Sequence, residues 1–239
     1  MKKILLLLLC SILIISCVDA QNKYFRKSDP LDTSTIAPFG DYNKAISLDT
    51  NNALAYKNRA REKYHLMDYD GAINDYTKAL KINPDDAYGW DGRGAAFIRI
   101  KDYEAALSDF NKAIALNNKL PNAYYNRGLA KVKLKMYESA LDDMNNAVEL
   151  GSTDADTYSE KGYIEYHLDM YTKADEDCSK AIAQDTVTEA NYINRGGARY
   201  MLHEYKGALN DYNKAISINP KNSDAYTGRG MVLSKMKKD

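Results

Sequence analysis

The chain has 239 residues, and its 33 Lys and Arg balance its 33 Asp and Glu, so the formal net charge is zero. That balance argues against a nucleic-acid-binding protein that works through bulk charge. Hydrophobic residues make up 45% and charged residues 28%, which argues against wholesale disorder. Three cysteines are too few for a disulfide framework, and three histidines are too few for a zinc module beside them.

The N-terminal segment 1–16 has the features of an export signal. A basic start is followed by an apolar run over residues 4–15, which is too short to span a bilayer as a mature helix. The run ends in Ile14-Ile15-Ser16-Cys17, which resembles the lipobox of bacterial lipoproteins. The resemblance implies that the signal peptide 1–16 is removed and that Cys17 carries the lipid, whose several acyl chains give stable anchoring. Secretion with an unmodified Cys17 is the alternative.

Residues 17–37 predict a flexible tether between the lipidated cysteine and a folded domain. The segment has no helical or strand period and contains turn residues such as Ser28-Asp29-Pro30. About 20 flexible residues reach roughly 25 Å, which is enough to hold a domain off a membrane surface. A tail without function is the alternative. Val18 replaces the Asp that retains some lipoproteins at the inner membrane, which favours the outer membrane.

One pattern recurs every 34 residues through the rest of the chain. Asp41-Tyr42-Asn43-Lys44-Ala45-Ile46 returns in similar form from residues 75, 109, 143, 177 and 211, without insertion or deletion. With repeat position 1 at Ala53, position 4 is always aromatic, position 8 is Gly or Ala, positions 20 and 27 are Ala, and position 17 is Tyr. The apolar residues of positions 1–14 and 17–29 have helical spacing, so each repeat predicts two helices that bury their faces against neighbouring repeats.

This framework resembles the tetratricopeptide repeat (TPR), and the resemblance covers Pro38 to the C-terminus. It implies an all-α fold, a right-handed TPR superhelix (α-solenoid) over residues 38–239 with five full repeats flanked by two half repeats. A lone second helix at about 38–49 comes first, and a C-terminal capping helix within 223–239 comes last. The full repeats are 53–86, 87–120, 121–154, 155–188 and 189–222.

A ladder of charges runs through the repeats, because position 23 is always Asp and position 7 is always basic. A partly buried Arg at position 7 needs a carboxylate partner. Pairing each Asp with the base of the following repeat uses all twelve groups, so we expect inter-repeat pairs such as Asp75–Arg93 and Asp109–Arg127. A row of cation sites has less support, since one carboxylate per repeat supplies too few ligands. The structural ladder comprises Asp41, Arg59, Asp75, Arg93, Asp109, Arg127, Asp143, Lys161, Asp177, Arg195, Asp211 and Arg229.

The fourth repeat departs from the framework. It has Lys161 in place of Arg, Asp175 where an aliphatic residue is usual, Cys178 at the aromatic position and Gln184 for an apolar residue. These changes indicate either a softer core from sequence drift or a local hinge or contact point. We expect Cys178 to be a buried, inert thiol.

Surplus tyrosines indicate a partner groove. Six of the 20 tyrosines lie outside both the framework and the tether, at positions 2, 5, 9 and 12 of the first helices. In the TPR family this stripe lines the concave surface, so the resemblance implies a binding site; packing of these tyrosines against neighbouring repeats is the alternative. The predicted groove comprises Lys57, Arg61, Tyr64, Tyr88, Ile98, Arg99, Tyr125, Leu129, Lys133, Tyr163, Tyr166, Ile193 and Tyr200.

Catalysis finds little support in the sequence. His65 and His167 share a repeat position but lie three repeats apart, and no nucleophile elbow, phosphate loop or metalloprotease helix appears. We therefore expect no catalytic residues, metal or cofactor. The favoured function is a non-enzymatic adaptor of the bacterial cell envelope, lipid-anchored at the outer membrane, that binds a partner protein or peptide in the groove. Glycan or peptidoglycan binding through the groove tyrosines is the second hypothesis.

Overall fold

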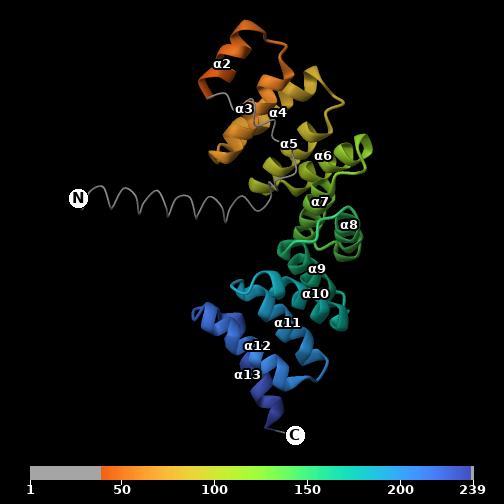
Figure 1. Cartoon of the computed structure of the whole chain (residues 1–239), viewed down its shortest axis with the longest axis vertical. Coiled ribbons are helices and arrows are strands. Elements are labelled where there is room, and N and C mark those ends of the chain that lie inside the picture. Colours follow the sequence, from red (N-terminus) through yellow and green to blue (C-terminus); the bar gives the residue numbers. More distant parts are fainter. Residues whose placement is uncertain (1–38, 238–239) are drawn as a thin grey trace, which may run out of the picture. The chain divides into compact units, whose positions relative to one another are not determined.

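The computed structural model describes residues 39–237, with side chains from residue 41 onward. These residues form twelve α-helices and no strand, so the all-α prediction is confirmed. The signal peptide, Cys17 and the tether lie outside the described residues. The helices are α2 (Phe39–Leu48), α3 (Ala53–His65), α4 (Tyr69–Ile82), α5 (Ala87–Arg99), α6 (Tyr103–Leu116), α7 (Pro121–Lys133), α8 (Tyr137–Glu149), α9 (Ala155–His167), α10 (Tyr171–Gln184), α11 (Glu189–Met201), α12 (Tyr205–Ile218) and α13 (Ser223–Met236) (Figure 1).

The described residues group into two compact units whose boundary lies within α7, between Ala130 and Lys131. Each unit is built from helix hairpins, one per repeat. In the first unit α3 packs on α4 and α5 on α6; in the second α9 packs on α10 and α11 on α12 (Figure 1). The second helix of a hairpin also packs on the first helix of the next, as α4 on α5 and α10 on α11. The sequence predicted one solenoid over residues 38–239, and each unit shows the predicted repeat packing.

Short turns of one conformation join the two helices of a hairpin. In the first, the N–H of Met67 donates to the Tyr64 carbonyl at 3.0 Å and that of Asp68 to the Lys63 carbonyl at 2.9 Å. These two hydrogen bonds cap the C-terminus of the helix. They hold the residue at repeat position 15 in the left-handed backbone conformation, although it is not a glycine. The uniform turn accounts for the constant period of the repeats. The residues at this position are Met67, Lys101, Lys135, Asp169 and His203, with φ between 59° and 66°.

Glycines at positions 6 and 8 of the second full repeat receive aromatic rings from position 24. A Cβ on Gly94 would lie 2.8 Å from the Phe110 ring of the same hairpin, and one on Gly92 would lie 2.5 Å from the Tyr76 ring of the preceding hairpin. Both distances are below any real Cβ contact, so these positions require glycine while the rings stay in place. Aromatic side chains at position 24 therefore pack both within their own hairpin and against the next one.

The charge ladder pairs within repeats, not between them, and the predicted inter-repeat ion pairs are wrong. In the first, second, fourth and fifth full repeats, the base at position 7 contacts the Asp at position 23 of its own repeat, on the other helix of the same hairpin. The reason is that position 8 packs on position 24, which brings the neighbouring side chains at 7 and 23 together. The contacts are Arg59–Asp75 at 2.7 Å, Arg93–Asp109 at 2.7 Å, Lys161–Asp177 at 2.6 Å and Arg195–Asp211 at 2.6 Å.

The ladder arginines also link repeats through position 25 of the preceding repeat. Arg59 donates its Nη1 to Asn43 Oδ1 at 2.7 Å, and Arg93 donates to Thr77 Oγ1 at 3.0 Å. Each of these guanidinium groups therefore donates hydrogen bonds to a carboxylate in its own hairpin and to a polar side chain in the preceding repeat. These arginines therefore do connect consecutive repeats, but through the small polar residue at position 25, which the sequence analysis did not predict.

Position 11 adds a second cation to several ladder carboxylates. Lys63 lies 2.8 Å from Asp75, and Arg199 lies 2.9 Å from Asp211. Arg199 also donates its Nε to Asp175 Oδ1 at 2.6 Å, which joins the fourth and fifth repeats. Asp175, which stands where an aliphatic residue is usual, therefore forms an ion pair between two repeats.

In the fourth repeat, position 11 is Glu165, so the charge there is reversed. Its side chain is 1% exposed, Lys161 Nζ lies 3.3 Å from its Oε1, and its Oε2 has no hydrogen-bond partner. Burial is the main cause that raises the pKa of Glu165 to about 7, and the charge of Asp177 adds to it. Cys178 is fully buried, and burial raises the pKa of its thiol to about 12, as expected for an inert cysteine.

Candidate partner-binding surface

Four of the thirteen predicted groove residues are core residues and present no surface to a partner. Tyr64 is 2% exposed, Ile98 6%, Tyr125 0% and Leu129 4%. Tyr64 packs among small residues of α3, α4 and α5, including Ala95. For Tyr64 and Tyr125, the alternative raised in the sequence analysis, packing against neighbouring repeats, describes their position.

The predicted groove residues of the first unit that retain exposure have partners inside the unit. Lys57 forms an ion pair with Asp86 at 2.9 Å. Arg99 donates its Nε and Nη2 to the Tyr69 hydroxyl at 3.1 and 2.9 Å, with its guanidinium 5.2 Å from the ring centre. Tyr88 packs against the core cluster of α5, α6 and α7. Arg61 is half-buried on α3.

In the second unit the predicted residues divide between core edge and surface. Ile193 and Tyr200 are half-buried and pack against the core clusters around Tyr192 and Tyr212. Lys133 is exposed at the end of α7. Tyr163 and Tyr166 instead belong to a group of aromatic rings that reaches solvent.

This group, the aromatic cluster, comprises Tyr137 of α8, Tyr163, Tyr166 and His167 of α9, and Tyr171 of α10. His167 is its centre and is exposed, whereas the tyrosines are half-buried. The His167 ring stacks on Tyr137 with centroids 4.8 Å apart and planes 5° apart, and meets Tyr163 edge-on at 4.4 Å. Tyr166 meets Tyr171 at 5.8 Å, and its ring lies against Gly197 of α11. Three consecutive helices therefore hold one continuous aromatic surface.

The surroundings of three rings of the aromatic cluster, Tyr163, His167 and Tyr171, favour their uncharged forms. Burial raises the pKa of Tyr163 to about 12, with a contribution from the Tyr137 hydroxyl, and the hydrogen bond to Asp169 is the largest cause that raises the pKa of Tyr171 to about 12. Burial lowers the pKa of His167. The rings offer apolar faces and hydroxyl tips, which suit apolar or aromatic side chains of a partner together with its backbone polar groups.

The sequence did not indicate Tyr137 and Tyr171, because they occupy framework position 17. A signal was present: this position is Tyr rather than Phe in all five full repeats. A hydroxyl at a packed position indicates a polar partner or an edge open to solvent. The structure shows such polar partners, since the Tyr69 hydroxyl accepts from Arg99 and the Tyr205 hydroxyl contacts His203 Nδ1 at 2.8 Å.

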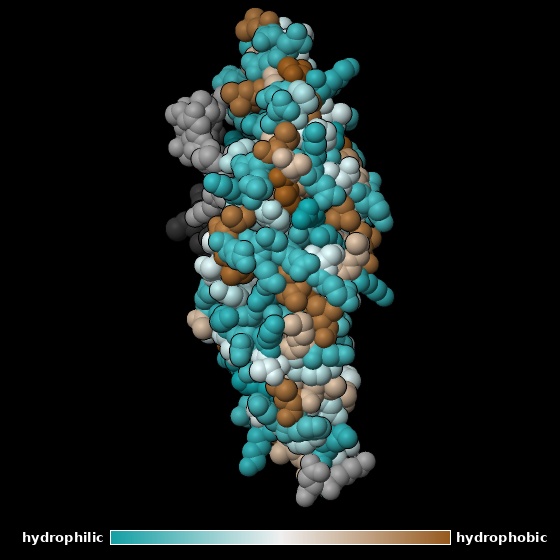
Figure 2. All heavy atoms as spheres, turned by 90° about the vertical axis from the view of Figure 1, so that its right-hand side faces the viewer, coloured by the Kyte–Doolittle hydropathy of each residue, from teal (hydrophilic) through white to brown (hydrophobic). Residues whose placement is uncertain are grey.

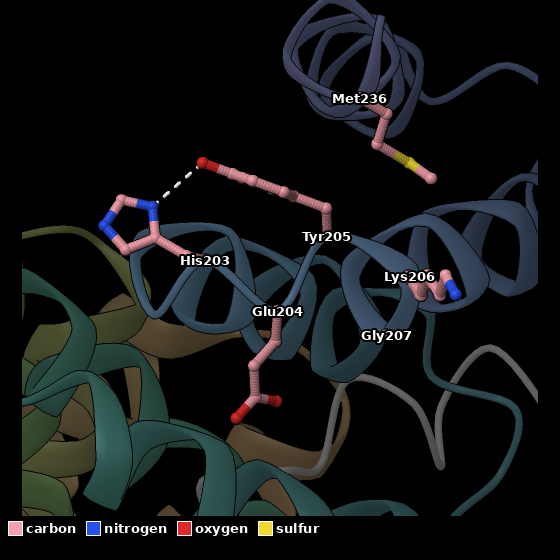
Figure 3. Close-up of a pocket in the computed structure, with 6 residues that line it drawn as sticks. All are labelled: His203, Glu204, Tyr205, Lys206, Gly207 and Met236. Atoms are coloured by element: carbon pink, nitrogen blue, oxygen red, sulfur yellow. Dashed lines mark hydrogen bonds between the residues drawn. The ribbon is translucent and has the colours of Figure 1, made fainter. Parts of the chain in front are cut away.

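A pocket of about 440 Å³ lies in the second unit between the turn before α12 and the end of α13 (Figure 3). Its lining residues are His203, Glu204, Tyr205, Lys206, Gly207 and Met236. Figure 3 shows Met236 reaching toward Tyr205 from α13, while Glu204 points away from them. Within the pocket, His203 Nδ1 lies 2.8 Å from the Tyr205 hydroxyl.

Residues 39–237 hold no group of three or more His, Cys, Asp or Glu that could bind a metal ion. None of the helices within this range is long and apolar enough to cross a membrane. On the face shown in Figure 2, hydrophobic residues form small separate groups among hydrophilic ones, rather than one broad apolar patch.

Comparison with protein families decides the assignment. Tetratricopeptide repeat profiles match residues 53–86 and 121–151, and a TPR repeat profile matches 94–135 and 192–237, so that together they cover more than half of the chain. The chain belongs to the TPR proteins. The TPR resemblance seen in the sequence is thereby confirmed. TPR proteins are typically non-enzymatic scaffolds, and this chain is a TPR scaffold for protein or peptide binding. No curated protein matches the chain significantly.

Several solved TPR structures share the fold. YrrB, described as a TPR protein with an unusual peptide-binding site, is 25% identical over 79% of this chain and 97% of its own, with a TM-score of 0.70. A MamA protein is 25% identical over 71% of this chain and 92% of its own, with a TM-score of 0.63. MamA from Desulfovibrio magneticus RS-1 is 20% identical over 72% and 97% of the two chains at a TM-score of 0.65, which shows the fold alone.

Proposed function

We propose that this TPR protein is a lipid-anchored adaptor of the bacterial cell envelope that binds a peptide segment of a partner protein on its aromatic cluster. The observation that carries the binding site is the accessibility of this cluster. Four other groove residues are buried, and others make contacts inside their own unit. The aromatic cluster contains the predicted groove residues Tyr163 and Tyr166 and combines exposed His167 with half-buried rings held in fixed positions. Rigid tyrosines are common binding hot spots, because they bury much area at a small cost in conformational entropy.

The comparison with YrrB supports a peptide as the partner element. YrrB is described as having a peptide-binding site, and it matches 79% of this chain. The neutral, hydroxyl-edged cluster favours a peptide with apolar or aromatic side chains over a strongly charged tail.

Site-specific photocrosslinking tests this site. A photoreactive phenylalanine analogue in place of His167 is expected to form one main adduct with a partner protein in the cells that make this chain. The same analogue in place of Glu176, an exposed residue of α10 outside the cluster, serves as the matched control and should form none. The proposal fails if position 167 gives no adduct or if both positions give the same adducts.

Glycan binding is the second hypothesis, because tyrosine faces also stack on sugar rings. The arrangement of the cluster favours it less, since the rings of Tyr137 and Tyr163 are already engaged with His167. Cosedimentation of the purified chain with protein-free cell wall separates the two hypotheses. Binding that Tyr163→Ala abolishes would replace the peptide with a glycan as the ligand.

The anchor is proposed from the sequence Ile14-Ile15-Ser16-Cys17. We expect Cys17→Ser to move the protein from the membrane fraction to the soluble or unprocessed fraction, because the thioether-linked lipid can no longer form. Cys10→Ser is the matched control and should leave the protein in the membrane fraction. Equal fractionation of the wild type and Cys17→Ser would contradict the anchor. Placement at the outer membrane is tested by separating the two membranes in the same experiment.

A further inference from the structure

Helix α13 is the first helix of a TPR hairpin, and its face for a second helix is open. Tyr226 at position 4 is 43% exposed, whereas its equivalents Tyr56 and Tyr192 are 8% and 6% exposed. Gly230 at position 8 has no atom within 4 Å of its Cβ position, while Gly94 in a complete hairpin faces an aromatic ring at 2.8 Å. The packing site that every full repeat fills with its second helix is thus vacant on α13 among the described residues.

The ladder is also incomplete on this helix. Arg229 donates to Asn213 of the preceding repeat at 3.1 Å, as the other ladder arginines do to their position-25 partners. It forms no ion pair with a carboxylate of the described residues, although Arg59, Arg93 and Arg195 each hold the Asp of their own hairpin. The guanidinium lies over the ring of exposed Tyr226, 5.1 Å from its centre.

Helix α2 is in the complementary situation: it is a second helix that has no first helix before it among the described residues. It is the second helix of a hairpin and packs on α3, as second helices pack on the next first helix. Its ladder residue Asp41 is exposed, whereas the five equivalent aspartates are between 1% and 3% exposed. Its Ala45 at position 27 is half-exposed, whereas the five equivalent alanines are between 0% and 2% exposed. Among the described residues, Asp41 and Ala45 of helix α2 are therefore not covered by a first helix in the way that their equivalents in the full repeats are.

We propose that α13 of one copy and α2 of a second copy combine into a complete TPR hairpin, so that the chains associate head to tail. Arg229 of the first copy takes the place of Arg59 in the Arg59–Asp75 pair, and Asp41 of the second copy takes the place of Asp75. The two faces match in charge and in repeat register. The contact is heterologous, so it extends into linear assemblies unless the geometry closes a ring. The interface residues lie outside the aromatic cluster, so this inference does not depend on the proposed peptide site.

Sedimentation velocity of the full chain in a non-ionic detergent tests the association. Between about 1 and 100 µM the wild type is expected to show sedimentation coefficients that rise with concentration. Arg229→Glu alone and Asp41→Lys alone are each expected to abolish this rise, because each creates a like-charge pair at the junction. An equimolar mixture of the two variants should regain it. The introduced acid then meets the introduced base at one junction, and the unchanged Arg229 meets the unchanged Asp41 at the next.

The matched control is Lys235→Glu, which makes the same change of charge on α13 at another exposed position; it should associate as the wild type does. Unchanged circular dichroism of every variant separates loss of association from loss of fold. A wild type that stays monomeric overturns the proposal, whether solvent or the chain's own residues 1–38 cover the face. Association of the single variants at wild-type strength, or a mixture that stays monomeric, also overturns it.

Discussion

Replacing Asp211 with alanine is expected to lower the free energy of unfolding of the second unit by about 3 kcal/mol. The carboxylate is 3% exposed and holds Arg195 at 2.6 Å and Arg199 at 2.9 Å. Its removal leaves two guanidinium groups without their carboxylate in a site where their side chains are only 15% and 22% exposed. Uncompensated buried charges cost about 3 to 5 kcal/mol, and the remaining bond of Arg199 to Asp175 puts the effect at the lower end.

Chemical denaturation followed by circular dichroism measures this effect. The matched control is Asp142→Ala on α8, which removes an exposed carboxylate next in sequence to a ladder residue and should change stability by less than about 0.5 kcal/mol. A double-mutant cycle with Arg195→Leu should give a coupling of about 1 kcal/mol or more. Equal stability of Asp211→Ala and the control would mean that the ladder has no structural role.

Glu165→Gln is expected to stabilise the protein at pH 8 by up to about 3 kcal/mol and to leave its stability at pH 4 nearly unchanged. The folded-state pKa of Glu165 is about 7, above the ordinary value of 4.5. The folded protein therefore holds this proton more tightly than the unfolded chain does. The stability that this proton contributes is fully present below pH 4.5 and is lost as the pH rises through 7, where the buried carboxylate must ionise.

The free energy of unfolding of the wild type and of Glu165→Gln is measured at several pH values from 4 to 8. In the difference between the two proteins, the titration of all other groups cancels. Lys161 keeps its contact with Asp177 at 2.6 Å in the variant, so the ladder pair is retained. The control is Glu149→Gln, at an exposed position of α8, which should give a difference that does not vary with pH. A flat difference for Glu165→Gln would show that Glu165 is solvated in the folded protein.

The helices and their hairpins follow from the sequence because the signals agree at every level. Helical spacing, small residues at position 8, aromatic residues at position 24 and a fixed period all require the same packing. The ladder partners were harder to predict, because the Asp of each repeat lies almost midway along the chain between the base of its own repeat and the base of the next. Only the contact of Gly94 with Phe110 within one hairpin decides between these two registers.

The burial of a groove side chain could not be predicted from its position within the repeat alone. Tyr64 and Tyr166 both occupy position 12, yet Tyr64 is fully enclosed beside Ala95 and Ala96, while Tyr166 retains exposure beside Gly197. Burial depends on the residues that the next first helix presents and on the rings nearby. A stripe read along one helix cannot contain that information, because the deciding residues lie in the following repeat.

The most direct test of the adaptor function is a titration of the partner segment that crosslinks to position 167. A synthetic peptide of that segment should bind the purified chain. Tyr163→Ala and His167→Ala should each increase the dissociation constant by about tenfold or more. Glu176→Ala, at an exposed position of α10 outside the cluster, should bind as the wild type does. If all four proteins bind the peptide with the same dissociation constant, the aromatic cluster is not the partner site.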